Sequence, residues 1–209
     1  VPLVSKVGPH KKVRYTNLYK APDPSHRGNL VRSEADVCLD VVRGLGWSGE
    51  MPAHYVAVSP YKGELPPTPL VGIGAGGKAN PYWRWKRYPR YAEVVEHVLE
   101  KDPQVHFVLV GVETDDGVPH NRVLDLRGKT SVREVADVLS RCSSFVGNDC
   151  GQAHIAAALG VPTTVVFGPT ERVKNLPPRN ARAVFHGDLA CQPCQYSSQG
   201  MGRYPGSKT

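Results

Sequence analysis

The sequence has no long apolar stretch. No run of hydrophobic residues approaches the roughly 20 needed to cross a bilayer, so no transmembrane segment is predicted. No signal peptide is recognisable, and the chain begins at Val1 without an initiator methionine, which is consistent with a fragment of a larger protein. Hydrophobic residues form 40% and charged residues 22% of the 209 residues, as in a globular protein. This length suits one domain, or one domain with an appendage.

Cysteine is also sparse. The five cysteines are odd in number and mostly scattered, which argues against a disulfide framework and favours a reducing compartment. Cys191 and Cys194 form a C-x-x-C pair, which is half of a zinc-ribbon spacing. Because no second pair follows, we do not expect zinc. A thioredoxin-like motif is not favoured either, because it would lie between an early strand and a helix.

Acidic residues are fewer than basic ones, at 19 against 26. The net charge of +7 and the pI near 9.2 favour an anionic partner: a sugar nucleotide, an anionic glycan or lipid, or nucleic acid. The sequence has no D-x-D triplet that would hold a metal on a nucleotide sugar, and Glu113-x-Asp115 has only a similar spacing. We therefore expect metal-independent chemistry.

Residues 143–169 organise the rest of the chain. A short apolar run at 145–147 is followed by a polar turn, an alanine-rich run at 153–159 and a β-branched run at 163–167. This order predicts strand, tight turn, helix and strand within a parallel sheet. The turn after the first strand then lies at the carboxyl edge of the sheet, where the amino end of the helix offers free N–H groups to a phosphate.

Other strands and helices alternate in the same way. Strands are predicted at 70–73, 105–110, 122–126 and 183–185, and helices at 26–46, 91–100 and 131–141. Ser131 and Glu134 have capping-box spacing, and the inward side of their helix is predicted to be Val132, Val135, Val138 and Leu139. The alternation predicts an α/β fold, a Rossmann-like parallel sheet covered by helices on both faces.

Glycines follow the first of these strands. Gly72-x-Gly74-x-x-Gly77 matches the dinucleotide fingerprint, but a long loop stands where that fingerprint needs a helix. A tight turn without a ligand is one interpretation. We favour the approach of a diphosphate, because basic residues that can neutralise it follow at once: Lys78, Arg84, Lys86, Arg87 and Arg90. The aromatic residues between them would also suit nucleic acid.

Three polar side chains are predicted near the same edge. Glu113, just past a strand, suits ribose hydroxyls, although a solvated acidic loop with Asp115 and Asp116 explains it equally well. Asp149 either orients a substrate or caps the helix that follows. His154 lies within one turn of the predicted anion site, whereas a lone histidine is usually structural.

These motifs together resemble glycosyltransferase family nine, the bacterial ADP-heptose:lipopolysaccharide heptosyltransferases. Residues 86–89, KRYP, are similar to the family's K-R-W-P, and residues 149–154, DCGQAH, are similar to D-T/S-G-x-x-H. Residues 168–170, GPT, and the C-x-P-C at 191–194 also resemble family features. Tyr88 stands where the family usually has Trp, and Cys150 where it has Thr or Ser.

The resemblance implies the carboxyl-terminal half of a GT-B fold, in which two Rossmann-like domains face each other. Residues 1–47 would be a remnant of the amino-terminal acceptor domain with its connecting helix. Residues 48–68, which are rich in proline, would be an extended linker, and residues 69–209 the nucleotide-sugar-binding domain.

The resemblance also implies an ADP-linked sugar as donor and no other cofactor. Lys86 would meet the donor's phosphates, Glu113 the ribose and Thr130 the adenine. Asp149, Gly151 and His154 would surround the diphosphate and the sugar. The complete set of donor-binding residues expected from the motifs is Gly74, Gly76, Lys86, Glu113, Thr130, Asp149, Cys150, Gly151 and His154.

The expected reaction follows. A hydroxyl of a saccharide or glycolipid acceptor would attack the anomeric carbon of the ADP-sugar, while Lys86 and the helix amino end stabilise the departing diphosphate. The catalytic base is expected in a missing amino-terminal domain or a partner chain. The protein is expected in the cytoplasm, either free or peripheral at the inner membrane face. The alternatives are a non-catalytic module that keeps the donor fold, an NAD-type oxidoreductase and a nucleic-acid binder.

Overall fold

The computed structural model describes residues 33–77 and 83–187. The chain divides into two units, Val1–Pro52 and Ala53–Thr209. In the first unit the described residues form one helix, α2 (Glu34–Arg43), which ends at Gly44. The helix predicted at 26–46 is confirmed over these ten residues, and its earlier part lies outside the described residues.

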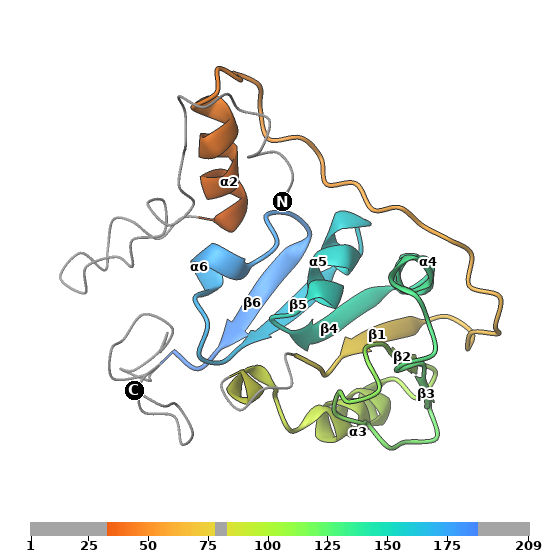
Figure 1. Cartoon of the computed structure of the whole chain (residues 1–209). Helices are drawn as coiled ribbons and strands as arrows, with labels where there is room; N and C mark the ends of the chain where they lie inside the picture. The colour runs from red at the N-terminus through yellow and green to blue at the C-terminus, as the bar shows by residue number, and fades with distance from the viewer. Residues whose placement is uncertain (1–32, 78–82, 188–209) are drawn as a thin grey trace. The chain divides into compact units, whose positions relative to one another are not determined.

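The second unit is built on a six-stranded parallel sheet (Figure 1). In chain order the strands are β1 (Leu70–Gly74), β2 (His106–Leu109), β3 (Val123–Asp125), β4 (Ser144–Asn148), β5 (Thr163–Phe167) and β6 (Ala181–Phe185). They lie in the order β3-β2-β1-β4-β5-β6, and every neighbouring pair runs parallel. Each strand coincides with a predicted one, because each is a short apolar or β-branched run bounded by turn residues.

Helices cover both faces of this sheet (Figure 1). On one face, α4 (Val132–Ser140) and α5 (Gly151–Ala158) share a buried cluster with Phe145 and Val165 of the strands. On the other face, α3 (Tyr91–Lys101) packs its Val95 into a second cluster that contains Phe107. The predicted α/β fold with both faces covered is therefore confirmed.

Small side chains bring α5 close to the sheet. Ala153, Ala156 and Ala157 are at most 2% exposed. After the helix, the amide of Val161 donates to the carbonyl of Ala156 at 3.0 Å, and Val161 is itself buried in the same cluster. The helix is thus anchored along its length and at its carboxyl end.

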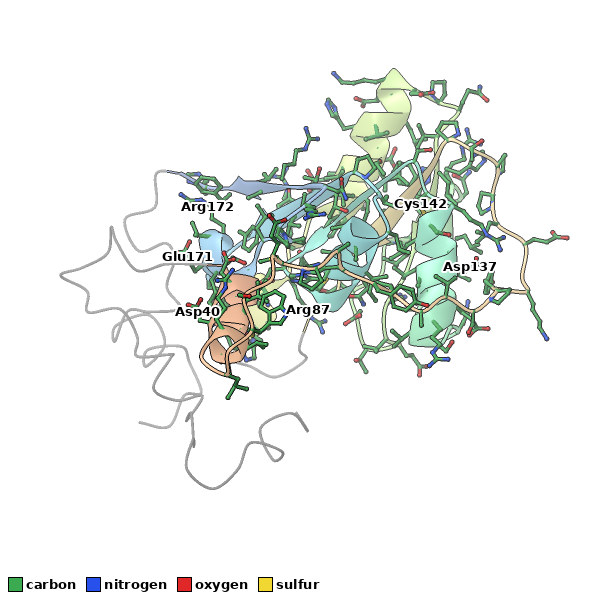
Figure 2. The ribbon with its side chains drawn as sticks, turned by 90° about the horizontal axis from the view of Figure 1, so that it is seen from above. Asp40, Arg87, Asp137, Cys142, Glu171 and Arg172 are labelled. Atoms are coloured by element: carbon green, nitrogen blue, oxygen red, sulfur yellow. The ribbon has the colours of Figure 1, made fainter. Side chains whose placement is uncertain are left out.

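The predicted linker is packed over part of its length. It forms no helix or strand between residues 47 and 69. However, the amide of Ser59 donates to the carbonyl of Arg133 at 3.1 Å, and the amide of Tyr61 donates to Oδ2 of Asp137 at 2.9 Å. Figure 2 shows Asp137 on α4 beside this extended segment. Tyr61 and Leu65 also pack against the core. The segment is extended, as a linker would be, but the part around Tyr61 and Leu65 is packed rather than unattached, because α4 gives it partners.

Two local features differ from the predictions. Val132 was predicted to face inward with Val135, Val138 and Leu139, which are buried, but Val132 is 70% exposed because it is the first residue of α4. The structure also contains two short helices that were not predicted, η3 (Arg84–Lys86) and α6 (Arg172–Asn175). Helices of three and four residues are too short to show a periodic apolar pattern.

The capping box of α4 gives a first testable prediction. Oγ of Ser131 accepts from the amide of Glu134 at 3.3 Å, and Oε2 of Glu134 accepts from the amide of Ser131 at 2.8 Å. Ser131→Ala should lower the free energy of unfolding by about 1 kcal/mol, because the helix loses a side-chain cap. Urea denaturation measures this difference. The matched control, Val132→Ala at the exposed neighbour, should change stability by no more than about 0.5 kcal/mol. Equal effects in both variants would contradict the role of the box.

Candidate functional site

The strand order creates a switch point between β1 and β4. From β1 the chain continues to β2 on one side, and it returns through α4 to place β4 on the other side of β1. The loops leaving the carboxyl ends of these two strands therefore diverge, and open α/β sheets bind ligands in such a crevice. A pocket of about 460 Å³ lies at this edge. Its described lining residues are Gly77, Trp83, Lys86, Val112, Asp115, Asp149, Cys150, Gly151 and Gln152.

Asn148, the last residue of β4, ties the walls of this pocket together. It is fully buried. Its Oδ1 accepts from the amide of Tyr88 at 3.0 Å and from the hydroxyl of Tyr91 at 2.9 Å. Its Nδ2 donates to the carbonyls of Ala75 at 2.7 Å and Gly76 at 2.9 Å. These bonds use the full capacity of the amide and join the loop after β1 and the start of α3 to β4.

Asp115 and Arg87 form a second tie. Asp115 is 6% exposed, so the interpretation of a solvated loop is wrong for this residue. Its Oδ2 accepts from the amide of Val112 at 2.9 Å, and its Oδ1 lies 3.3 Å from Nη2 of Arg87. Arg87, labelled in Figure 2, also donates to the carbonyl of Gly77 at 2.7 Å and to the exposed Asp116 at 3.2 Å. The loops after β1 and β2 are thereby held together.

Lys86 and Asp149 form a shielded ion pair in the pocket. Nζ of Lys86 lies 2.8 Å from Oδ2 of Asp149, and the two side chains are 18% and 7% exposed. Nδ2 of Asn175 donates to the same oxygen at 3.0 Å. Nζ of Lys86 also lies 5.4 Å from the centroid of the Trp83 ring. Charges interact strongly where water is largely excluded, so an anion entering the pocket competes with Asp149 for Lys86.

The start of α5 faces the pocket. The N-cap residue is Cys150, and the alternative that Asp149 caps the helix is wrong, because Lys86 and Asn175 hold its carboxylate. Burial raises the pKa of the Cys150 thiol to about 11, so this thiol stays protonated at neutral pH. Apart from its two chain neighbours and the backbone of its own helix, a Cβ added at Gly151 would meet no atom of the described residues within 4 Å. The first turn of α5 is thus open to a ligand that approaches its N–H groups.

Gly74, which ends β1, and Gly76, which follows that strand, were predicted to bind the donor and are also required by the packing around them. A Cβ at Gly76 would lie 2.0 Å from the carboxyl carbon of Asp115, and a Cβ at Gly74 would lie 2.7 Å from Phe145. Any larger residue would therefore displace the Asp115 carboxylate or the core. Neither glycine lines the pocket, and contact of either with a diphosphate stays a prediction.

Glu113, Thr130 and His154 do not line the pocket either. Glu113 is exposed, and a Cβ at Gly128 would lie 3.1 Å from its Cβ, so the loops after β2 and β3 meet there. Oγ1 of Thr130 is buried and has no hydrogen-bond partner among the described residues. His154 is exposed on α5. Their assignments to ribose, adenine and sugar stay predictions.

Sequence reasoning missed Asn148 and Asn175. The signal for Asn148 was its position, at the end of a buried strand directly before the polar turn. For Asn175 there was no signal, because α6 itself was not predicted.

A second pocket, of about 610 Å³, borders the same chain segment. Its described lining comes from residues 84–89, Asp116 and residues 166–168. Lys86 therefore lines both pockets.

No metal site is found within residues 33–77 and 83–187, since no three His, Cys, Asp or Glu side chains there are grouped so that they could hold an ion. Cys191 and Cys194 lie outside the described residues. The cysteines of the described part, Cys38, Cys142 and Cys150, are free thiols. None of the described helices is long and apolar enough to cross a membrane. Metal independence stays a prediction.

The sequence profile of glycosyltransferase family 9 (heptosyltransferase) matches residues 78–204, which include every residue of the Lys86–Asp149–Asn175 group. The chain therefore belongs to this family. This assignment favours the glycosyltransferase interpretation over an NAD-type oxidoreductase or a nucleic-acid binder.

Curated relatives are similar over part of their length. Lipooligosaccharide heptosyltransferase 2 of Haemophilus influenzae is 32% identical over 111 residues, which cover 49% of this chain and 32% of that protein. Lipopolysaccharide heptosyltransferase 2 of Salmonella typhimurium is 31% identical over 114 residues, with the same coverage of 49% and 32%. The chain thus spans about a third of the length of these relatives.

Solved structures share the fold. A family 9 glycosyl transferase from Veillonella parvula superposes with a TM-score of 0.57 at 18% identity, over 81% of this chain and 56% of that one. The heptosyltransferase TibC, solved in complex with ADP-D-beta-D-heptose, gives a TM-score of 0.52 at 18% identity, over 68% and 36%. The parallel sheet with its helices is thus the GT-B-type fold of heptosyltransferases over part of their chains, as predicted.

The buried amide of Asn148 gives a second testable prediction. Asn148→Ala should lower the free energy of unfolding by about 3 kcal/mol or more, because buried donors and acceptors of two loops lose their partner. Tyr91→Phe removes only one of these bonds and should cost about 1 kcal/mol. Chemical denaturation compares both with Asn121→Ala, a change at an exposed turn residue that should have little effect. A small effect of Asn148→Ala, like that of the control, would show that the loops hold themselves in place.

Proposed function

We propose that this chain binds the donor of a heptosyltransferase-type glycosyltransferase, an ADP-sugar, whose glycosyl group passes to a saccharide or glycolipid acceptor. The observation that carries this proposal is the pocket at the switch point of the sheet. There Lys86, Asp149 and the open first turn of α5 meet within the region that matches the family.

The diphosphate of the donor fits between Lys86 and the start of α5. The N–H groups of the first helical turn point toward the helix start, and with the helix dipole they favour an anion. Lys86 supplies a positive charge beside them, since it lines the same pocket as Gly151. These groups stabilise the charge that develops on the leaving diphosphate as the glycosidic bond breaks.

The sugar would lie beside Asp149. Both contacts to its carboxylate fall on Oδ2, and Oδ1 accepts no hydrogen bond from the described residues. A carboxylate oxygen that lines a pocket can accept a hydrogen bond from a sugar hydroxyl. Glu113 and Thr130 lie on the loops after β2 and β3, which meet at Gly128, and we propose that these loops take the ribose and the adenine.

In the reaction, an acceptor hydroxyl attacks the anomeric carbon, the bond to the diphosphate breaks, and ADP leaves. The hydroxyl proton passes to a general base. We propose that an amino-terminal acceptor domain or a partner chain supplies this base, as it does the acceptor site. The alternative function is that of a module that binds the donor without turnover. Because the chain spans only about a third of the length of its relatives, turnover should be measured separately from binding.

Ligand class gives a third testable prediction. ADP and ADP-D-beta-D-heptose should each raise the melting temperature of the chain by about 3 °C or more at saturation, because both carry the diphosphate. NAD, which carries the same diphosphate, should stabilise the chain no more than ADP does, and EDTA should leave the ADP effect unchanged. Thermal melts with each ligand provide the measurement, and release of ADP in the presence of an acceptor separates turnover from binding alone. Stabilisation by NAD without ADP, or an EDTA effect reversed by magnesium, would contradict this proposal.

The open space at Gly151 gives a fourth prediction. Gly151→Ala should keep the fold and raise the free energy of unfolding by about 0.5 kcal/mol, because the added methyl group meets no protein atom and the unfolded chain loses freedom. The same methyl group occupies the space that a phosphate needs, so affinity for ADP should fall about tenfold. Calorimetric titration and denaturation measure the two effects.

The control for this prediction is Gly187→Ala, at a glycine outside the pocket where a Cβ is also tolerated. It should leave ADP affinity unchanged. If Gly151→Ala binds ADP as well as the parent chain does, no phosphate approaches the start of α5.

A further inference from the structure

Asn175, on α6, does not line the pocket itself but contacts the lining residue Asp149. Its Nδ2 donates to Oδ2 of Asp149 at 3.0 Å, the oxygen that also faces Nζ of Lys86 at 2.8 Å. Asp149 is 5% exposed, so an oxygen that lost both donors would be left without a partner in a largely dry site. The carboxylate thus has one charged donor and one neutral donor.

The helix that carries Asn175 is itself fixed. Glu171 caps α6 by accepting from the amide of Val173 at 3.0 Å, and the guanidinium of Arg172 lies 4.0 Å from the centroid of the Phe185 ring. Figure 2 labels Glu171 and Arg172 at the start of this helix. Leu176, directly after it, packs against the core. Asn175 is therefore presented by an anchored turn.

We propose that Asn175 is a positioning residue that holds Asp149 in place when the donor draws Lys86 toward its diphosphate. This inference rests on the proposed function. The two donors of Asp149 differ in what a diphosphate does to them. It attracts the ammonium of Lys86, whereas the amide of Asn175 is neutral and stays. With Asn175 in place, the carboxylate keeps its orientation and offers Oδ1 to a hydroxyl of the sugar.

The role of Asn175 predicts a selective loss of affinity. Asn175→Leu removes the donor and keeps a similar volume. It should weaken binding of ADP-D-beta-D-heptose by about tenfold and binding of ADP by less than about twofold, because only the sugar meets Asp149. A merely structural residue would lower both affinities alike. The matched control is Asn180→Gly, which removes an asparagine bond to the carbonyl of Ala157 at 3.0 Å outside the pocket and suits the φ of 56° at that position.

Asn175→Asp tests the same hydrogen bond in a single variant, in which pH switches the donor on and off. The introduced carboxyl group can donate to Asp149 only when it is protonated, and two adjacent carboxylates share a proton at low pH. Relative to the parent chain, its affinity for the ADP-heptose should therefore recover at about pH 5 and fall toward about pH 8. Within the described part of the chain, the charged and titratable groups that face Asp149 are Lys86 from η3 and the Cys150 thiol. Burial raises the pKa of that thiol to about 11, so it does not titrate in this range.

Calorimetric titrations of both ligands with each variant separate the outcomes. A parent chain that binds neither ligand overturns the proposed function itself. If the parent binds both, equal losses for ADP and ADP-heptose in Asn175→Leu overturn the role of Asn175 alone. Should Asn175→Leu fail to fold, a pH profile of Asn175→Asp parallel to that of the parent overturns it as well.

Discussion

The buried amide of Asn148 is the constraint on which the site depends. Its four hydrogen bonds connect the end of β4 to the loop after β1 and to the segment that enters α3. Among the described residues, the loop after β1 and the entry to α3 are tied directly to this side chain, and Arg87 with Asp115 ties the loop after β2 to the loop after β1. Because any other rotamer of this amide would break several buried hydrogen bonds, Asn148 holds the backbone on both sides of the pocket, next to Asp149 and close to Lys86.

The charges of the pocket are neutralised within the protein before any ligand arrives. Lys86 is paired with Asp149, and Arg87 with Asp115 and Asp116, although the chain carries a net charge of +7. Such pairing avoids the large cost of isolated buried charge. It also makes selectivity a matter of exchange, because a ligand must offer Lys86 a better partner than a carboxylate.

The parts that could be predicted from the sequence are those that depend on neighbours along the chain. The strands at Leu70 and Thr163, and the box formed by Ser131 and Glu134, follow from local pattern and were placed correctly. The burial of Asp115 depends on Arg87, which is 28 residues away, and the anchoring of Tyr61 depends on Asp137, at a separation of 76. No local pattern contains such contacts. The lining of the pocket by Lys86 and Gly151 was predicted through motif resemblance, which encodes three-dimensional proximity indirectly.

The alanine side of α5 has a mechanical consequence. Ala153, Ala156 and Ala157 have no rotamers to exchange, and they lie against a parallel sheet with almost no exposed surface. A helix seated in this way cannot shift along the sheet without opening empty space beneath it. Another wall of the pocket is the short 3₁₀ helix η3, which carries long side chains. Lys86 of η3 lines both pockets, so this wall has open space on two sides and room to move. The α5 side of the pocket is thus the more rigid one, and adaptation to ligands of different size falls on residues 83–86, which precede the anchored Arg87 and Tyr88.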